Sequence, residues 1–251
     1  MSKLFHRLLS ASILTLFLSI VSAAFAKYNP PPDQRPPRGN TTSTGSRGGG
    51  CSGVSKVTLT ALAPQKYIGQ TVSTRPSFAW FVPDSQSYKM EFTLYEYTSG
   101  DNKKLIKKVE LNSSPGIMKL SLPESIPDLT VGKTYLWQVA ILCNEGYPSS
   151  DLVTRAELEV IPLPTNVKMS LDTVKEPLQR SDIYANSGFW YDALTEALKA
   201  DNTPQSRAAI SSLLEELANF ESAEVSRELV KVANIKRQNR MNNENVESAN
   251  M

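Results

Sequence analysis

The sequence predicts an α+β protein in two segregated parts, an antiparallel β-sandwich followed by a helical-hairpin bundle. The first observation is a change of hydrophobic period: apolar residues alternate from residue 54 to about 161 and then recur every three or four residues. The second is the spacing of turn residues, which predicts about seven strands and about four helices. We therefore expect the sandwich over residues 51–162 and the helical part over residues 165–236.

Residues 1–26 are predicted to be a secretory signal peptide. A basic start precedes the apolar run "LLSASILTLFLSIVSAAFA", which begins at Leu8 and has small residues, Ala24 and Ala26, at the cleavage spacing. The alternative is an uncleaved membrane anchor, because a run of about 19 apolar residues is long enough to span a bilayer. Cleavage gives a mature chain that begins near Lys27, is exported to the periplasm or beyond, and has no membrane span.

Residues 27–50 are predicted to be a disordered tether. The segment contains five prolines and five glycines and almost no apolar side chains, so it cannot bury enough surface to offset its loss of conformational entropy. At the other end of the chain, residues 237–251 include five asparagines and are expected to form a disordered tail.

The strands of the first part are predicted from runs with period two. "VTLTALA" and "SFAWFV" come first, and "YKMEFTLYEY" then places Met90, Phe92 and Leu94 on one face. "KKLIKKVEL" is rich in lysine, which predicts an edge strand because charged side chains discourage pairing with another edge. "IMKLSL", "TYLWQVAIL" and "TRAELEVI" complete a sandwich of about one hundred residues.

One local pattern resembles the tyrosine corner of fibronectin type III and immunoglobulin-like domains. In "LTVGKTYLWQV", Tyr135 follows a glycine and opens a strand. The resemblance implies that its hydroxyl binds the backbone upstream. Trp80 in "RPSFAWFVP" likewise resembles the core tryptophan of an early strand in that fold.

The two cysteines, Cys51 and Cys143, are predicted to form a disulfide, since an even count is typical of exported chains. The bridge would close a loop of roughly 90 residues, which the loop-entropy model values at about 4 to 5 kcal/mol. It does not match the inter-sheet bridge of antibody domains, because Cys51 precedes the first strand. The alternative is two free thiols.

The second part is predicted to be helical. Pro177 interrupts an early amphipathic run and should kink or restart its helix. One helix is expected up to Asn186 and another from Phe189 to Ala200. A third opens at "TPQSRAAISSLLEELANF", where threonine and proline suit the cap and first position of a helix, and "SAEVSRELVKVANIKR" is the fourth.

The stretch "YANSGFWYDAL" resembles a tetratricopeptide helical hairpin. In that motif a glycine, here Gly188, lies at the turn, and an alanine, here Ala193, sits where the two helices approach most closely.

Phe189, Trp190 and Tyr191 are the candidate contacts for a ligand or partner. Successive residues on a helix point in all directions, so we expect at least one of these rings at the margin of the core. There it could stack on a sugar or anchor a protein partner. The alternative is that Phe189 or Trp190 packs on the sandwich while Tyr191 spans the rim and Asp192 caps the helix.

Charge and histidine content exclude several function classes. Removal of the signal peptide leaves 25 basic and 25 acidic residues, so the mature chain lacks the positive field that binds nucleic acid without sequence preference. The one histidine, His6, also lies in the signal peptide. A chain without imidazole cannot form a Ser-His-Asp triad, a Cys-His pair or a histidine zinc site. We expect no catalytic residue, no metal and no cofactor.

Taken together, "GGGC", "RPSFAWFVP" and "YANSGFWYDAL" resemble secreted cyanobacterial proteins of domain-of-unknown-function family 928. That resemblance implies export and architecture but no activity. We expect an exported, non-catalytic interaction or structural module of the cell envelope, with an envelope protein or a glycan as its partner. The alternative is a carbohydrate-binding protein or a hydrolase that uses paired carboxylates, with Glu215, Glu216, Glu221 and Glu224 as the available acids.

Overall fold

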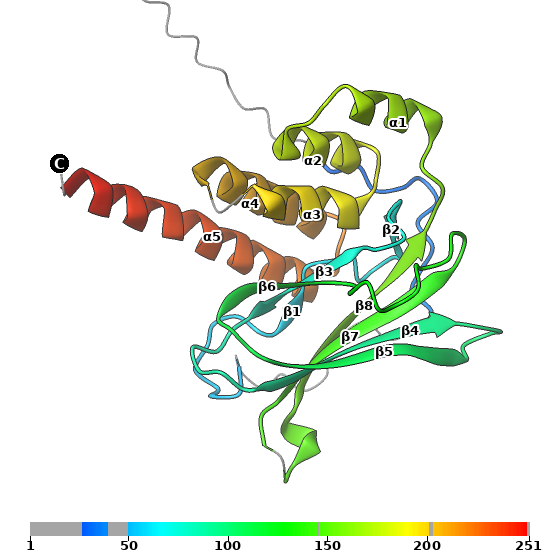
Figure 1. Cartoon of the computed structure of the whole chain (residues 1–251). Helices are drawn as coiled ribbons and strands as arrows, with labels where there is room; N and C mark the ends of the chain where they lie inside the picture. Colours follow the sequence, from blue (N-terminus) through cyan, green and yellow to red (C-terminus); the bar gives the residue numbers. More distant parts are fainter. Residues whose placement is uncertain (1–26, 40–49, 145, 201–202, 250–251) are drawn as a thin grey trace, which may run out of the picture.

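The computed structural model describes residues 27–39, 50–144, 146–200 and 203–249 (Figure 1). The predicted signal peptide, residues 1–26, and most of the second half of the predicted tether lie outside these ranges. The described chain has mixed α+β content, with the strands first and the helices last. None of the helices within these ranges is long and apolar enough to cross a membrane.

Within the described ranges, eight strands form two sheets. The five-stranded sheet has the order β2 (Gly69–Thr71), β8 (Leu152–Val160), β7 (Thr134–Leu142), β4 (Lys89–Tyr97), β5 (Lys103–Asn112). The three-stranded sheet has the order β1 (Thr60–Ala61), β3 (Ser77–Val82), β6 (Gly116–Ser121). β2 pairs parallel with β8, so the expectation of a wholly antiparallel sheet is wrong at this edge.

The alternating pattern of β4 sets which face of the large sheet is buried. Met90, Phe92 and Leu94 are buried to 1% exposure or less, and the Phe92 ring lies 5.0 Å from the ring of Phe78 in β3. The two sheets therefore meet through these side chains. β5, the lysine-rich strand, is at the end of the strand order, as its charge predicts.

In the part of the chain that the structure describes, five helices follow the strands, one more than predicted. They are α1 (Thr165–Asp172), α2 (Pro177–Asn186), α3 (Trp190–Lys199), α4 (Pro204–Ala218) and α5 (Ala223–Ala249). Pro177 is the first residue of α2, so it starts a new helix instead of kinking one, since proline has no backbone N–H to donate. The side chain of Thr203 accepts the N–H of Ser206 and caps α4.

The C-terminal segment departs from prediction. α5 continues to Ala249, whereas the asparagine content of residues 237–251 predicts a disordered tail. Asparagine is an indifferent helix former, and an existing helix extends one hydrogen bond at a time, which costs less than starting a new one.

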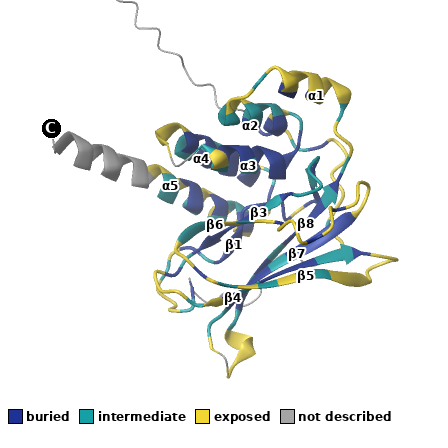
Figure 2. Ribbon diagram, viewed as in Figure 1, coloured by how far each residue is buried: buried dark blue, intermediate teal, exposed yellow. Residues whose placement is uncertain are grey.

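Strands and helices share one hydrophobic core. The helices lie together beside the strands (Figure 1), and the buried residues are continuous from the sheets into α2, α3, α4 and the start of α5 (Figure 2). A boundary near residue 163 therefore separates types of secondary structure but not two cores.

The first half of the predicted tether, residues 27–39, is ordered and packed on the protein. We call this segment the strap. Tyr28 is fully buried, with its ring 4.9 Å from that of Trp190. The N–H of Asn29 donates to the carbonyl of Ala185 at 3.1 Å. The prediction of disorder is wrong here because one buried ring and a few backbone hydrogen bonds offset the ordering entropy of a proline-rich segment that has little freedom to lose.

The far end of the strap is held by one carboxylate. Glu157 in β8 accepts the backbone N–H groups of Arg38 and Gly39, each at 2.9 Å, and the hydroxyl of Tyr97 at 2.6 Å. Arg35 pairs with Glu159 on the same strand. The strap thus joins the turn after α2 to β8 of the five-stranded sheet.

Candidate functional site

The three aromatic side chains that the sequence singles out lie at the start of α3, with Phe189 just before its first residue, and all of them are buried. Phe189 is 3% exposed, Trp190 is fully buried and Tyr191 is 3% exposed. The expectation that one ring lies at the margin is wrong. A lone helix would leave one face open, but α3 is enclosed by strands on one side, by α2 and α4 on others, and Trp190 is covered by Tyr28 of the strap.

Trp190 and Tyr191 also use their polar atoms inside the core. The Trp190 indole Nε1 donates to the carbonyl of Leu62 at 2.8 Å. The Tyr191 hydroxyl accepts from Nε1 of Trp137 at 2.9 Å and donates to the carbonyl of Glu157 at 3.1 Å. These bonds fix α3 against both sheets, and the burial of polar groups is tolerated because each one is paired.

Gly69 in β2 makes room for the Tyr191 ring. A Cβ at this glycine would lie 2.8 Å from Cε2 of Tyr191, which is closer than carbon atoms approach. The short β2 strand can therefore run directly beside α3. Asp192 makes a second link directly after this strand, since its Oδ2 accepts the N–H of Val72 at 3.0 Å.

Asp192 is a buried carboxyl group at the edge of a polar pocket. Its burial raises its pKa from 3.8 to about 6, an effect opposed by hydrogen bonds from Val72 and Thr71. The pocket has a volume of about 370 Å³ and lies between α2 and α3 on one wall and the start of β3 and end of β6 on the other. Its lining residues are Ser73, Arg75, Pro76, Ser77, Ser121, Tyr184, Tyr191, Asp192, Thr195, Glu196 and Lys199.

The helical wall of this pocket has paired charges. Glu196 is 7% exposed, and its Oε1 lies 3.1 Å from Nζ of Lys199 and 3.4 Å from Nε of Arg180. Thr195, one residue before it, donates its hydroxyl to the carbonyl of Tyr191 at 2.6 Å. Asp192 and Glu196 are four residues apart on α3 and so share a face.

The side chains of the strand wall are also held by hydrogen bonds and an ion pair. Arg75 donates to the carbonyls of Pro123 and Ile126 at 3.1 and 2.8 Å and pairs with Asp128 at 2.7 Å. The hydroxyls of Ser77 and Ser121 lie 2.8 Å apart. Because these side chains are already held by neighbours, the pocket presents a fixed arrangement of hydroxyl groups and charges of both signs, which lowers the entropy cost of binding.

The other acids considered from sequence do not gather into a site. Glu221 accepts the backbone N–H groups of Gln65 and Lys66 at 3.0 and 2.9 Å, and burial raises its pKa to about 7. Glu215 pairs with Arg237 at 2.8 Å. Across the described ranges, no group of three or more histidine, cysteine or acidic residues is placed to hold a metal ion.

The other residues singled out from the sequence form contacts that hold the fold. Cys51 and Cys143 form a disulfide. The hydroxyl of Tyr135 accepts the N–H of Thr130 at 2.8 Å, and Trp80 is fully buried.

Gly188 and Ala193 lie between α2 and α3. Gly188 has a φ of +86°, which places it in the left-handed region. Ala193 is fully buried, and its carbonyl accepts the hydroxyl of Ser181 in α2 at 2.8 Å.

Sequence reasoning missed most of the pocket. Ser73, Arg75 and Ser121 are common residue types in loops and strand ends, and nothing in their local pattern distinguishes them. Only the i, i+4 spacing of Asp192 and Glu196 on an otherwise apolar helix is a signal, because acids on a buried helix face need polar surroundings.

Comparison with known proteins gives a family and no activity. The family model described as Domain of Unknown Function (DUF928) matches residues 42–234. A search of curated proteins finds no match. Among solved structures, the sensor domain of the anti-sigma factor RsgI4 of Pseudobacteroides cellulosolvens is similar at 13% identity and a TM-score of 0.27, covering 44% of this chain and 99% of that one.

Proposed function

The chain belongs to the DUF928 family, whose description names no activity, and we propose that it is an exported, non-catalytic interaction module of the cell envelope. The observation that carries this proposal is the polar pocket between α3 and the strands. Its walls come from both parts of the chain, and its volume falls in the range of small-ligand sites, roughly 300 to 1,000 Å³.

Export is supported by the disulfide between Cys51 and Cys143, since such bonds persist mainly in oxidising compartments. The apolar run before Lys27 supports a cleaved signal peptide. The intact mass of the protein purified from its native host tests this point. A mass that begins near Lys27 supports export, and a mass that includes residues 1–26 contradicts cleavage.

A non-catalytic role is supported by how the pocket's carboxyl groups are used. Asp192 accepts the backbone N–H of Val72, the residue after β2, and Glu196 is paired with two cations. A glycosidase needs one carboxyl group that donates a proton and a second that attacks or activates water. Both acids here hold the fold together, so we assign them to positioning the pocket wall.

A carbohydrate is the second candidate for the ligand, and the lining favours it. Hydroxyl groups of Ser73, Ser77, Ser121 and Thr195, carboxylates and an amine are the groups that exchange hydrogen bonds with sugars. Tyr184 adds an aromatic ring to the same lining. We therefore propose an envelope glycan as the first ligand to test.

The test compares binding before and after the pocket is filled. Ser121→Tyr places a large side chain at the exposed rim, at the end of β6 where an aromatic residue suits a strand. Ser85→Tyr is the matched control, since Ser85 is exposed in a loop that does not line the pocket. We expect an array of envelope polysaccharides to bind the unmodified protein and the control, and to lose binding to Ser121→Tyr.

Equal binding by both variants would place the ligand elsewhere. If no polysaccharide binds, and one envelope protein copurifies with the control but not with Ser121→Tyr, the ligand is a protein and the glycan assignment is overturned. Trp190→Ala is unsuitable for this test because Trp190 is fully buried and its loss would damage the core.

The finer fold assignments belong to the same proposal. The bond from Thr130 to the Tyr135 hydroxyl supports an immunoglobulin or fibronectin type III-like sandwich. The turn at Gly188 and the close contact at Ala193 support a tetratricopeptide-like hairpin of α2 and α3. A cyanobacterial origin stays a prediction.

A further inference from the structure

The polar pocket between α3 and the strands exposes its cations and buries its carboxyl groups. The side chain of Lys199 is 52% exposed and that of Arg75 is 35% exposed, whereas Asp192 and Glu196 are both buried. All four residues line the pocket. A ligand that enters from solvent therefore meets positive charge before it meets a carboxyl group.

The helix wall has two cations for one carboxylate. Oε1 of Glu196 lies 3.1 Å from Nζ of Lys199 and 3.4 Å from Nε of Arg180. Arg180 is also held by the carbonyls of Leu171 and Val174, to which it donates at 3.1 and 3.2 Å. The Lys199 ammonium has three N–H donors and gives one of them to Glu196. Because about half of its side chain is exposed, Lys199 is the cation that an incoming anion can reach.

The strand wall offers hydroxyl groups. The Arg75 guanidinium on this wall is occupied, since its Nε lies 2.7 Å from Asp128 and its terminal nitrogens donate to two backbone carbonyls. The hydroxyls of Ser77 and Ser121 bind each other at 2.8 Å, which leaves one O–H donor and several lone pairs between them. These are the groups that exchange hydrogen bonds with the hydroxyls of a sugar ring.

We propose that the polar pocket binds a sugar with one carboxylate, a uronic acid residue of an envelope polysaccharide. Lys199 pairs with the carboxylate, and Ser77 and Ser121 bind the ring hydroxyls. A single excess positive charge on the helix wall suits a carboxylate better than a phosphate monoester, which carries about −1.5 to −2. This inference rests on the function proposed for the pocket and specifies the class of glycan.

Asp192 makes the charge of this pocket depend on pH. Burial raises its pKa from 3.8 to about 6, so the helix wall gains one negative charge as pH rises through that value. The attraction for a carboxylate then falls. Tyr184 stays neutral over this range, since burial raises its pKa. The charged and titratable groups around Asp192 are Glu196 and Lys199 on α3, Arg180 and Tyr184 on α2, and Arg75 before β3.

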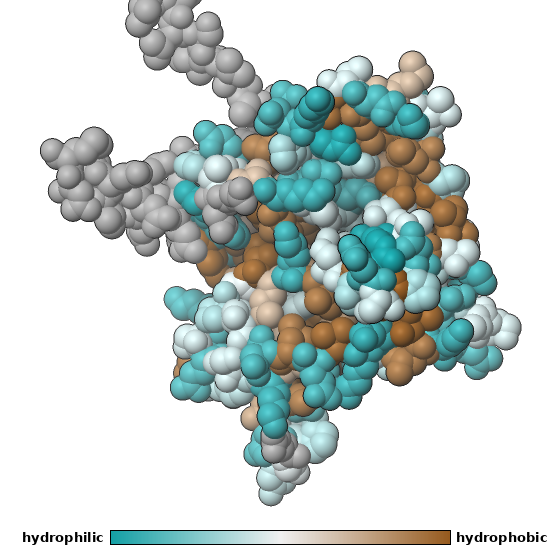
Figure 3. Space-filling model, viewed as in Figure 1, coloured by the Kyte–Doolittle hydropathy of each residue, from teal (hydrophilic) through white to brown (hydrophobic). Residues whose placement is uncertain are grey.

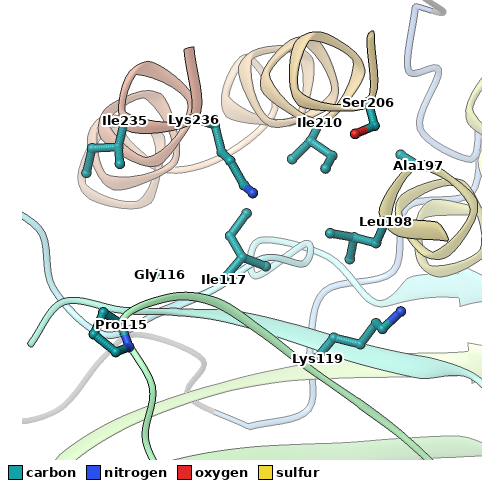
Figure 4. A pocket seen from close by; sticks show the side chains of 10 residues that line it. All are labelled: Pro115, Gly116, Ile117, Lys119, Ala197, Leu198, Ser206, Ile210, Ile235 and Lys236. Carbon is teal, nitrogen blue, oxygen red and sulfur yellow. The ribbon is translucent and has the colours of Figure 1, made fainter. Parts of the chain in front are cut away.

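A second cavity, of about 500 Å³, lies between β6 and helices α3, α4 and α5 and has a different lining (Figure 4). Ile117, Leu198 and Ile210 point toward one another there (Figure 4), and among its described lining residues Ser206 alone has a hydroxyl group. Both cavities lie along the boundary between helices and strands, where Figure 3 shows hydrophilic residues among hydrophobic ones. The hydroxyl groups that suit a sugar are thus concentrated in the polar pocket, and Lys119 in the second cavity tests this choice.

The first experiment compares acidic sugars with their neutral counterparts. The probes are tetrasaccharides of polygalacturonate, alginate and hyaluronate, each with its carboxyl-reduced form, in isothermal titration calorimetry with the mature chain, residues 27–251. We expect at least one acidic probe to bind roughly three- to tenfold more tightly than its reduced form, by an amount that shrinks as salt rises. Ser121→Tyr should abolish this binding.

The two ways of failing are distinguishable. If a reduced probe binds as tightly as its acidic form and Ser121→Tyr abolishes both, the pocket binds a glycan but the carboxylate assignment is overturned. If no probe, acidic or neutral, binds the unmodified protein, the glycan assignment of the pocket falls as well.

The second experiment removes the cation. Lys199→Gln should weaken binding of the acidic probe by roughly three- to tenfold and leave that of the reduced probe unchanged. Lys231→Gln is the matched control, because Lys231 pairs with Glu228 on α5 at the same i, i+3 spacing and is 43% exposed. Equal losses in both variants would show that only net charge matters and would overturn the site. A loss for Lys119→Gln and none for Lys199→Gln would place the ligand in the second cavity and also overturn it.

The third experiment follows the same affinity from pH 5 to pH 8. Binding of the acidic probe should weaken by roughly two- to fivefold as Asp192 ionises, whereas binding of the reduced probe should stay constant. Asp192→Asn should remove this pH dependence. Glu221→Gln should retain it, because Glu221 also has a raised pKa but does not line the pocket. An unmodified protein whose affinity for the acidic probe does not change with pH would contradict the role of Asp192.

Discussion

Two separate constraints require glycine at position 188, Gly188. Its φ of +86° lies in the left-handed region, where a side chain costs about 1 to 2 kcal/mol. In addition, a Cβ at this position would lie 3.2 Å from the carbonyl oxygen of Asn29 and 3.2 Å from the nitrogen of Pro31. The glycine is therefore needed both for the turn between α2 and α3 and for the passage of the strap over that turn.

A comparison of two alanine substitutions separates these constraints. Gly132 has a φ of +83° and nothing within 4 Å of a Cβ. Gly132→Ala should therefore lower the free energy of unfolding only because alanine is unfavourable at a positive φ. We expect Gly188→Ala to lower the free energy of unfolding in urea by about 1 kcal/mol more than Gly132→Ala, since the strap must shift. Equal losses would mean that the strap does not press on this turn.

Glu221 should make stability depend on pH. Burial raises its pKa from 4.5 in the unfolded chain to about 7 in the folded protein. The folded state then binds more protons between these values, so its contribution to stability is complete below pH 4.5 and is lost as pH rises through about 7. The loss amounts to at most about 3 kcal/mol. Asp192, with a pKa raised to about 6, acts in the same direction.

The variant Glu221→Gln isolates this effect because it cannot titrate. Urea unfolding at pH 5 and pH 8 should show a larger fall in stability for the unmodified protein than for Glu221→Gln. Glu215→Gln is the control, because Glu215 lies at the surface beside Arg237. A fall that is the same in all three proteins would contradict the assignment.

At the scale of elements, the disulfide fixes the segment before the first strand. Cys51 is joined to Cys143 just after β7, and Asp84 holds the same segment by accepting the N–H groups of Cys51 and Ser52 at 2.9 and 3.2 Å. The bridge spans 92 residues of sequence. It thereby ties the segment before β1 to the end of β7, which is distant along the chain.

Loss of the bridge should therefore be costly. We expect the double variant Cys51→Ser, Cys143→Ser to be less stable than the oxidised protein by about 2 to 5 kcal/mol in urea unfolding. Dithiothreitol should lower the midpoint of the unmodified protein and leave that of the double variant unchanged. An unmodified protein that is insensitive to complete reduction would show that the bridge adds no stability.

Elements with strong local signals could be predicted from sequence, and those without could not. β4 has three large apolar residues in strict alternation, and α4 opens with a threonine cap followed by Pro204, so each is specified by its own residues. β2 has only three residues and begins with Gly69. It exists because β8 offers it a parallel partner and Tyr191 packs against its glycine, and these are contacts that no local pattern encodes.

Order in the strap likewise could not be predicted from its own residues. Composition predicts disorder by averaging over residues 27–50, whereas order in residues 27–39 depends on single contacts such as Tyr28 against Trp190. The hydroxyl of Tyr28 also accepts from Tyr67 at 2.9 Å inside the core. These partners are 39 and 162 residues away along the chain, so the contacts exist only once the whole molecule has folded.

At the scale of the whole molecule, the polar pocket depends on both parts of the chain. One wall is formed by α2 and α3, and the other by residues near Arg75 and Ser121. The sequence singles out Tyr191 and Asp192 through their place beside Gly188, but it predicts an exposed ring there. The structure instead makes them the floor and edge of a pocket whose other wall comes from distant segments.

α3 joins strands and helices into one folding unit, so that both walls of the polar pocket are held in place. Three hydrogen bonds connect α3 to the strand region: Trp190 to Leu62, Trp137 to Tyr191 and Val72 to Asp192. Differential scanning calorimetry of the oxidised mature chain tests this most directly. We expect a single transition whose calorimetric and van't Hoff enthalpies agree, and two separate transitions for strands and helices would contradict the account.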